Sequence, residues 1–165
     1  MLKKELNNLC RGCNGEFCCH GKAYMTTGEM KIIKKRTNLP FEKFVSIESI
    51  NGEDYLMIKR KGNFCIFFDR NSQKCRIYPY RPIDCQLFPF TLEVINKKIN
   101  VTFNKRCIKD KKIIDKKIVE GVIELIKKFP KKEMIKYALY NIHDQKNEEA
   151  QLKGISLEKR HQVNS

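Results

Sequence analysis

The chain has 165 residues, 41% of them hydrophobic, and a formal net charge of +15 at pH 7. Its length suits one domain with an appendage. No stretch approaches the roughly 18 apolar residues of a membrane span, and the N-terminus lacks the apolar core of a signal peptide. We therefore expect a cytoplasmic protein that does not contact membranes. The positive residues are mostly lysines spread along the chain, which favours a solvated basic surface over a dedicated nucleic-acid face.

The first predicted feature is a loop over residues 1–25, which holds four cysteines and three glycines. Thr26 and Glu29 then have the spacing of a capping box, in which each side chain accepts a hydrogen bond from the other residue's backbone N–H. This predicts a helix to about Arg36, with Met30, Ile32 and Ile33 facing inward. Leu39-Pro40 ends the helix, because a residue before proline disfavours helical backbone.

Short strands are predicted in the middle of the chain. Residues 55–60 and 64–68 are expected to be strands, residues 69–72 form a turn, and residues 75–78 are extended. Apolar and polar residues alternate over 91–95 and 99–103 on either side of Asn96-Lys97-Lys98. This alternation predicts a β-hairpin.

The C-terminal third is predicted to be helical. Apolar residues recur at helical spacing over 110–129 and again over 134–142, with Pro130 between the two segments. From His143 onward polarity rises and the periodicity fades. We therefore expect an α+β fold with a cysteine-rich metal-binding domain over 1–109, a helical segment over 110–143, and a mobile tail over 144–165.

Eight cysteines are the chemical signal of this sequence. Cytosolic thiols stay reduced, so cysteines this dense predict metal ligation rather than disulfides. Thiolate sulfur binds zinc and iron, either around one ion or in an iron–sulfur cluster. The candidate metal ligands are Cys10, Cys13, Cys18, Cys19, Cys65, Cys75, Cys85 and Cys107.

How these cysteines are grouped stays open at this point. Neighbouring side chains in extended backbone point to opposite sides, so Cys18 and Cys19 are expected to serve different sites or roles. Two four-sulfur sites or one site with additional cysteines both fit the count. His20 is an alternative ligand, and Cys85 is an alternative nucleophile because basic Arg81 could lower its pKa.

The residues between Cys75 and Pro89 carry the most specific likeness. Their sequence, Cys-Arg-Ile-Tyr-Pro-Tyr-Arg-Pro-Ile-Asp-Cys-Gln-Leu-Phe-Pro, resembles the signature of the CxxCxxCC family of zinc- or iron-chelating cysteine-cluster proteins. The resemblance spans about residues 10–107. One difference is that four residues, rather than two, separate Cys13 from Cys18.

The resemblance implies a protein that chelates zinc or iron, with an iron–sulfur cluster as one form of the cofactor. Flagellin lysine N-methylases carry a similar cluster, so a protein-modifying enzyme or its subunit is an alternative, and a nucleic-acid-binding metal module is a further one. An unidentified protein partner is compatible with each of these. Arg81 is expected to offset the charge of metal-bound sulfur or to form a surface ion pair.

Overall fold

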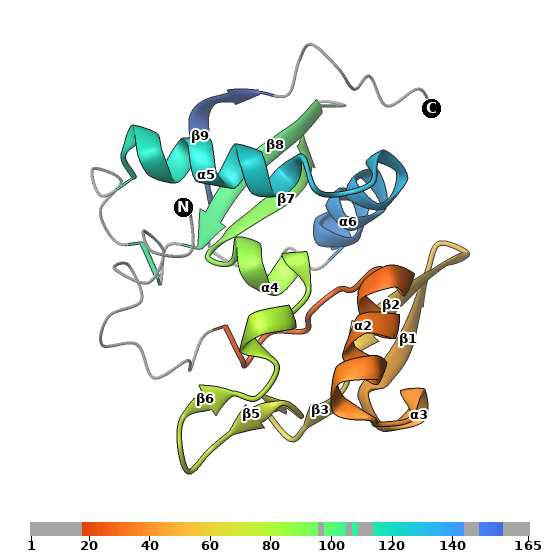
Figure 1. Ribbon diagram of the computed structural model, residues 1–165. Helices are drawn as coiled ribbons and strands as arrows, with labels where there is room; N and C mark the ends of the chain where they lie inside the picture. The colour runs from red at the N-terminus through yellow and green to blue at the C-terminus, as the bar shows by residue number, and fades with distance from the viewer. Residues whose placement is uncertain (1–17, 96–97, 105–106, 109–113, 144–148, 157–165) are drawn as a thin grey trace. The chain divides into compact units, whose positions relative to one another are not determined.

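The computed structural model describes residues 18–95, 98–104, 107–108, 114–143 and 149–156 (Figure 1). The predicted ligands Cys10 and Cys13 lie outside the described residues. The chain divides into two compact units: Cys10–Gln86 forms one, and Leu87–Ser165 together with Met1–Leu9 forms the other. We call them the cysteine unit and the C-terminal unit.

A β-hairpin and a helix form one part of the cysteine unit. Helix α2 (Thr27–Thr37) is followed by the short helix α3 (Phe41–Phe44) and by the antiparallel pair β1 (Val45–Ile50) and β2 (Glu53–Ile58). The turn between the two strands places Asn51 and Gly52 at positive φ values of 52° and 79°, which glycine and asparagine tolerate best. The hairpin and the two helices are drawn in orange in Figure 1.

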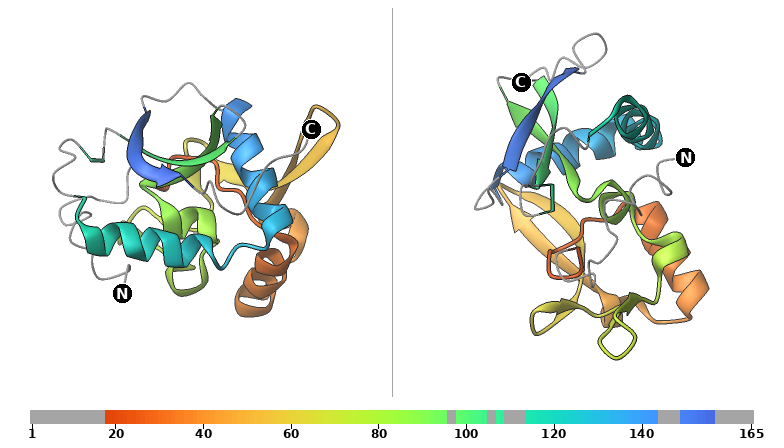
Figure 2. Two further views of the ribbon diagram at one scale, coloured as in Figure 1. Left: turned by 90° about the horizontal axis from the view of Figure 1, so that it is seen from above. Right: turned by 90° about the vertical axis from the view of Figure 1, so that its left-hand side faces the viewer.

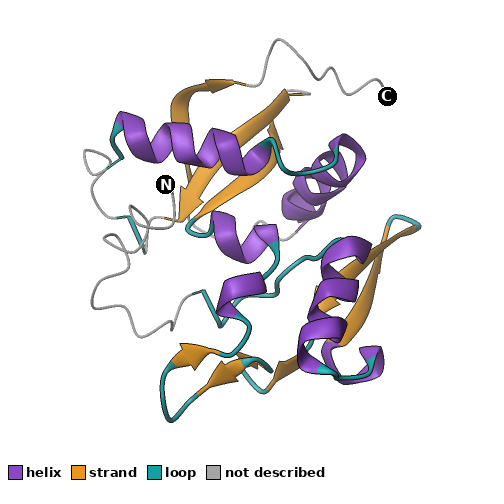
Figure 3. Cartoon of the chain, in the orientation of Figure 1, coloured by secondary structure: helices purple, strands orange, loops and turns teal. Residues whose placement is uncertain are grey.

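Two very short hairpins and two short helices complete this unit. Strand β3 (Arg60–Lys61) pairs with β4 (Phe64–Cys65), and β5 (Phe68–Asp69) pairs with β6 (Lys74–Cys75). A 3-10 helix, η1 (Tyr78–Tyr80), and helix α4 (Ile83–Leu87) follow. Figure 3 shows how much of this region is loop and turn, as expected where several short segments each carry a cysteine.

One apolar cluster holds the cysteine unit together. Its buried members come from α2, α3, β2 and the loops and turns between elements: Ala23, Met25, Ile33, Phe44, Ile58, Phe67 and Ile77. Three cysteines pack against this cluster, namely Cys65, Cys75 and Cys85. The apolar core therefore brings together cysteines that are distant in the sequence.

The C-terminal unit is a three-stranded antiparallel sheet with two helices. Strand β8 (Lys98–Asn104) lies between β7 (Phe90–Ile95) and β9 (Glu149–Ser156). Helix α5 (Lys116–Ile126) and helix α6 (Lys131–His143) lie beside this sheet, and α6 packs on β7 (Figure 2). Asp115 caps α5 by accepting from the backbone N–H of Ile118 at 2.9 Å.

The α+β fold with a hairpin and C-terminal helices is confirmed. The capping box is also present, but Ile32 is 50% exposed where an inward position was expected. Strand β2 pairs with β1, and no strand was predicted at the position of β1. Strand β9 falls in the segment for which we predicted a tail. The division into 1–109, 110–143 and 144–165 stays a prediction.

None of the described helices has both the length and the apolar character that a bilayer-spanning segment needs. The cytoplasmic location stays a prediction.

Candidate metal centre

Cys18 and Cys19 lie in a turn, and their sulfur atoms are 3.9 Å apart. We expected opposite directions for these side chains, which holds for extended backbone only. The turn removes that constraint, so both sulfurs face the same region. A tetrahedral site with metal–sulfur bonds of about 2.3 Å has sulfur–sulfur edges of about 3.8 Å. The spacing of Cys18 and Cys19 therefore fits two ligands of one ion.

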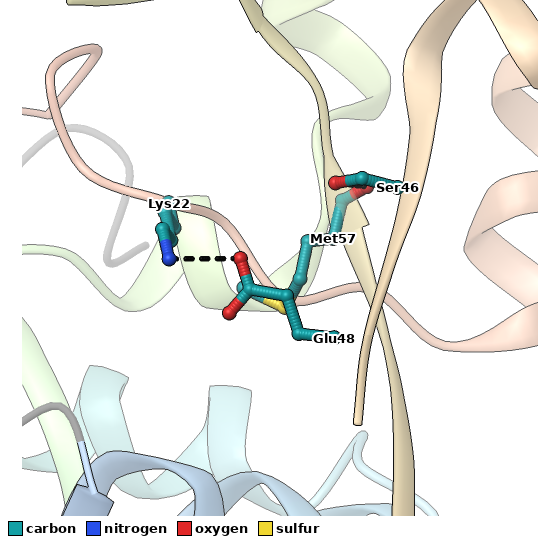
Figure 4. A network of polar contacts seen from close by, with 4 residues as sticks. All are labelled: Lys22, Ser46, Glu48 and Met57. Atoms are coloured by element: carbon teal, nitrogen blue, oxygen red, sulfur yellow. Dashed lines mark hydrogen bonds and ion pairs between the residues drawn. The ribbon is translucent and has the colours of Figure 1, made fainter. Parts of the chain in front are cut away.

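The segment that follows Cys19 is fastened to the β1–β2 hairpin. Its backbone runs beside β2: the N–H of Met25 donates to the carbonyl of Leu56 at 2.9 Å, and the N–H of Ile58 donates to the carbonyl of Ala23 at 2.8 Å. Figure 4 shows an ion pair that adds to this attachment, in which Lys22 Nζ lies 2.9 Å from Glu48 Oε1 on β1. These contacts hold in place the segment that directly follows the turn with Cys18 and Cys19.

Cys65 is tied directly to this turn. Its backbone N–H donates to the carbonyl of Cys19 at 2.8 Å. Its sulfur accepts hydrogen bonds from the backbone N–H groups of Phe67 and Phe68. Hydrogen bonds of this kind stabilise a thiolate, because the N–H dipoles point at the negative charge.

Cys75 repeats the arrangement of Cys65. Each cysteine ends a two-residue strand, and each is followed two residues later by a fully buried apolar residue, Phe67 or Ile77. The backbone N–H of Ile77 bonds to the sulfur of Cys75 as that of Phe67 bonds to the sulfur of Cys65. The two hairpins therefore offer their cysteine sulfurs in the same way.

Cys85 is carried by α4, and two carboxylates fix this helix to the rest of the unit. Glu29 Oε1 accepts from the backbone N–H of Ile83 at 2.6 Å. In return, Asp84 Oδ2 accepts from the backbone N–H of Tyr24 at 2.8 Å. The capping carboxylate of α2 thus also holds the start of α4, and α4 holds the segment that leads from Cys19 to α2.

The five described cysteines of this unit lie within electrostatic reach of one another. Burial is the largest cause that raises the pKa of Cys65, to about 11, and neighbouring Cys75 and Cys18 raise it further. Burial also raises the pKa of Cys75, and it raises that of Cys85 well above its ordinary value. A divalent cation supplies the charge that allows several buried thiols to ionise together.

Cys18 and Cys19 behave as a pair in which one sulfur gains negative charge at the expense of the other. The two thiols share a hydrogen bond in which either sulfur can be the donor, and this bond is the main cause that lowers the pKa of Cys18 to about 7. The same bond raises the pKa of Cys19, with burial adding to the effect. Burial opposes the shift at Cys18, while the positive charge of Arg81 supports it.

Arg81 is the cation that acts on three of these cysteines. Its charge favours the thiolates of Cys18, Cys75 and Cys85. Its guanidinium stacks on the ring of Tyr78, 3.8 Å from the ring centroid, which fixes its position. Its Nε is buried, and in the described part of the chain it has no hydrogen-bond partner. An N–H donor in this position suits a charge-rich sulfur acceptor.

A complete ligand set is not formed by the described residues alone. Among residues 18–95, 98–104, 107–108, 114–143 and 149–156, no three His, Cys, Asp or Glu side chains are arranged to hold one ion. The chemistry of the donor set nevertheless fits a thiophilic metal, because the sulfurs of Cys18 and Cys19 already have the spacing of a shared ion. Additional sulfur is available from Cys10 and Cys13, which precede this turn in the sequence.

Two other candidates are Cys107 and His20. Cys107 belongs to the C-terminal unit and lies in a turn after β8. His20 follows Cys19, and its ring packs edge-on against Phe64 with the ring centroids 4.1 Å apart. Its buried Nε2 has no hydrogen-bond partner in the described part of the chain. The metal-ligand roles of all eight cysteines stay predictions.

The alternative role of Cys85 as a nucleophile does not fit its surroundings. We considered that Arg81 would lower the pKa of Cys85. The Arg81 charge does act in that direction, but burial and the neighbouring Asp84 outweigh it and raise the pKa well above the ordinary value. A thiol that stays protonated is a poor nucleophile.

The sequence reasoning missed the long-range role of Glu29 and Asp84. Glu29 was identified as the capping residue of α2, and it is one, since it accepts from the Thr26 N–H at 2.9 Å. Its second bond, to Ile83, spans 54 positions. No local pattern reports such a contact, although the acidic residue directly before Cys85 was a signal that this short segment could be a helix start.

Comparison with known proteins supports the same chemistry. A family model described as "CxxCxxCC: Putative zinc- or iron-chelating domain" matches residues 9–108. Among curated proteins, "Uncharacterized protein MJ0661" of Methanocaldococcus jannaschii is 32% identical over 91 residues, which cover 53% of this chain and 48% of that protein. The chain thus spans about half the length of this relative. No solved structure matches the chain.

Proposed function

Given that this chain belongs to the CxxCxxCC family of zinc- or iron-chelating domains, we propose that its cysteine unit binds a single metal ion through thiolates, with zinc as the resident ion and iron as the alternative. Cys18 and Cys19 would supply two ligands. No third side chain of the described residues is placed to share the ion with them, so further ligands would come from Cys10 and Cys13, or from Cys65, Cys75 and Cys85 if their sulfurs move closer when the metal binds. The ion would join segments that the small apolar core of the unit joins only in part.

The observation that carries this proposal is the 3.9 Å separation of the Cys18 and Cys19 sulfurs. It is close to the edge of a tetrahedral thiolate site around one ion. A four-iron cluster uses one cysteine per iron and so holds its cysteine sulfurs farther apart than a single ion does. The spacing therefore supports a mononuclear site over a four-iron cluster.

The electrostatics support the same proposal. Four of the five cysteines have raised pKa values and so would carry protons at neutral pH. The main cause is burial for Cys65, Cys75 and Cys85, and the hydrogen bond with Cys18 for Cys19. Binding of a metal displaces these protons, and Arg81 lowers the net negative charge of the resulting thiolate group. The bound metal would stabilise the folded form of the chain. It would also place a metal–thiolate group near the surface, at Cys18.

Elemental analysis of protein purified without oxygen tests the proposal, together with its absorption spectrum. We expect about one zinc per chain and no visible absorption. Iron with an equal amount of inorganic sulfide and a broad visible band would replace the proposal with an iron–sulfur cluster. Protein that contains no metal after purification and gains none when zinc is added would contradict it altogether.

A further inference from the structure

We propose that the two short hairpins β3–β4 and β5–β6 form a binding surface for the phosphodiester backbone of a nucleic acid. Strands β3, β5 and β6 lie together in the cysteine unit (Figure 1). The exposed cations of this surface are Arg60, Lys61, Arg70, Lys74 and Arg76. We call these five residues the basic hairpin surface. The inference goes beyond the proposed metal binding and does not rest on it.

Positive charge is concentrated in this segment of the chain. Residues 59–76 contain six lysines and arginines but a single acidic residue, Asp69. The lysines of the whole chain are spread out, which led us to expect a merely solvated surface. Arginines, in contrast, gather here, since three of the chain's eight lie in this segment. Arginine is the better phosphate ligand, because its planar guanidinium donates two parallel hydrogen bonds to phosphate oxygens.

The two hairpins form one surface because Arg70 reaches from one to the other. Arg70 follows β5, and its guanidinium lies over the ring of Phe64 in β4, 4.6 Å from the ring centroid. Its Nη2 also lies 3.9 Å from the position that a Cβ would take on Gly62, in the turn between β3 and β4. Phe64 is paired with Lys61 across that turn. The charge of Arg70 therefore lies at the first hairpin.

The fold holds the three guanidiniums in place without a carboxylate. Arg60 Nη2 donates to the carbonyl of Asn63 at 2.8 Å, and Arg76 Nη2 donates to the carbonyl of Ile66 at 2.6 Å. Arg70 is held by the aromatic ring beneath it. Within the part of the chain that the structure describes, none of the three forms an ion pair. A guanidinium has five N–H donors, so each arginine keeps donors for a ligand while its position is already fixed.

Asp69, the acidic residue of this segment, leaves most of the positive charge uncompensated. Its Oδ1 accepts from the backbone N–H groups of Asn71 at 2.9 Å and of Ser72 at 3.3 Å, which fixes the turn after β5. The charge of Arg76 acts on this carboxylate. One carboxylate can offset only one of the five charges of the basic hairpin surface. The surface therefore attracts anions.

The lack of exposed apolar side chains favours a nucleic acid over an acidic protein as the partner. The exposed large hydrophobic residues of the described chain are Ile32, Ile47 and Tyr78, and none of them belongs to residues 59–76. Protein interfaces usually bury apolar or aromatic anchor residues at their centre. Interfaces with nucleic acids are more polar and strongly positive. Contacts to phosphates alone carry no base information, so binding should tolerate any base sequence.

Fluorescence anisotropy with labelled oligonucleotides of mixed sequence tests the inference on the full chain as purified. Single-stranded RNA, single-stranded DNA and duplex DNA are compared at several salt concentrations, and the preferred probe identifies the source of the phosphodiester backbone. Five phosphate contacts predict a slope of about −3.5 in the logarithm of affinity against that of salt for a single strand. Affinity without salt dependence would overturn the inference. Equal affinity for a poly-glutamate peptide would also overturn it, in favour of an acidic protein.

Two matched variants locate the surface. The triple substitution Arg60→Gln, Arg70→Gln and Lys74→Gln should weaken binding at least about tenfold and make the slope shallower by about 2. The control is the triple substitution Lys31→Gln, Lys35→Gln and Arg36→Gln on α2, which removes three exposed charges from the same unit. It should leave the slope unchanged. Equal losses in the two variants would overturn the inference, because net charge alone would then explain binding.

Lysine acetylation of the unaltered chain gives an answer even if the first variant fails to fold. Sulfo-N-hydroxysuccinimide acetate labels exposed lysines, and peptide mass spectrometry compares labelling with and without the oligonucleotide. We expect Lys61 and Lys74 to be protected and Lys31 and Lys35 to react as before. Protection of the α2 lysines instead would overturn the inference.

A failure of the proposed metal site would remain distinguishable. Metal content, measured on the same preparations, should be equal in the unaltered chain and the two triple variants, because no sulfur is removed. Metal-free protein that still binds oligonucleotides through Lys61 and Lys74 would refute the metal site and support the basic hairpin surface. Protein that holds one zinc per chain and binds no oligonucleotide would support the metal site and overturn this inference.

Discussion

The carboxylate of Glu29, on α2, accepts a hydrogen bond from the backbone N–H of Ile83, the first residue of α4, at 2.6 Å. The same carboxylate accepts from the backbone N–H and the hydroxyl of Thr26. One side chain thus caps its own helix and holds a second helix, which carries Cys85. This relationship links the local capping signal in the sequence to the geometry of the proposed metal site.

Replacing Glu29 with glutamine is expected to lower the free energy of unfolding by about 1–3 kcal/mol, because a charged acceptor of several partly buried hydrogen bonds is lost. Urea unfolding measures the change. The matched control is Glu42→Gln, since Glu42 is an exposed glutamate in the first turn of α3, and its replacement should change stability by no more than about 0.5 kcal/mol. Equal effects of the two substitutions would contradict the role given to Glu29.

A Cys85→Ser substitution should lower metal content and folded fraction together, since a buried ligand and its contacts in the apolar cluster are both altered. Inductively coupled plasma mass spectrometry gives the metal content, and circular dichroism follows the fold. Ile77→Val is a control that disturbs the same cluster without removing a sulfur. It should cost about 0.5–1.5 kcal/mol and leave the metal stoichiometry unchanged. Unchanged metal content in the Cys85→Ser protein would exclude Cys85 as a ligand.

Removal of the metal by a chelator should loosen the cysteine unit and spare the C-terminal unit. Hydrogen exchange is the suitable measurement, because it resolves local opening. We expect the amide of Cys65, which donates to Cys19, to lose protection after treatment with EDTA. The paired strands β7 and β8 serve as an internal control and should keep theirs. Equal loss of protection in both units would show that the metal stabilises more than the cysteine unit.

The reactivity of Cys18 in metal-free protein should depend on pH in a defined way. The pKa of Cys18 is lowered to about 7, first by the hydrogen bond with Cys19 and then by the charge of Arg81. Its alkylation by iodoacetamide should therefore reach half of the maximal rate near pH 7, since the thiolate is the reacting form. Replacing Arg81 with glutamine removes a favourable charge, so the midpoint should move to higher pH.

The control for this experiment is Arg36→Gln, which removes an exposed arginine from the last turn of α2. Its profile should match that of the unaltered protein, because Arg36 is not among the groups that shift the pKa of Cys18. A midpoint near the ordinary thiol value of about 8.5 in the unaltered metal-free protein would contradict the predicted environment of Cys18.

Local signals in the sequence were sufficient for several of the regular elements. Thr26 and Glu29 specified the start of α2, and alternation around residues 96–98 specified the β7–β8 hairpin. Helical spacing of apolar residues predicted the buried face of α5, where Ile118, Val122, Leu125 and Ile126 are buried. These features depend on residues that are close in the sequence, so the sequence pattern alone predicts them.

The rest depended on contacts between distant segments. Strand β1 has a partly exposed pattern, with Ile47 62% exposed, and it is stabilised by pairing with β2 rather than by its own composition. The spacing of the Cys18 and Cys19 sulfurs follows from a turn. The backbone hydrogen bond from the N–H of Cys65 to the carbonyl of Cys19 helps to hold this turn. The sequence predicts the cysteines as candidate ligands, whereas which of them lie near one another required the fold.

The most direct test of a single-ion thiolate site is X-ray absorption spectroscopy of the metal-loaded, full-length chain at the metal edge. The account predicts a first shell dominated by sulfur at about 2.3 Å, with no metal–metal scattering path. A first shell of nitrogen and oxygen atoms would contradict ligation by the cysteines. A metal–metal path would contradict a mononuclear site and would show that Cys18 and Cys19 serve a cluster.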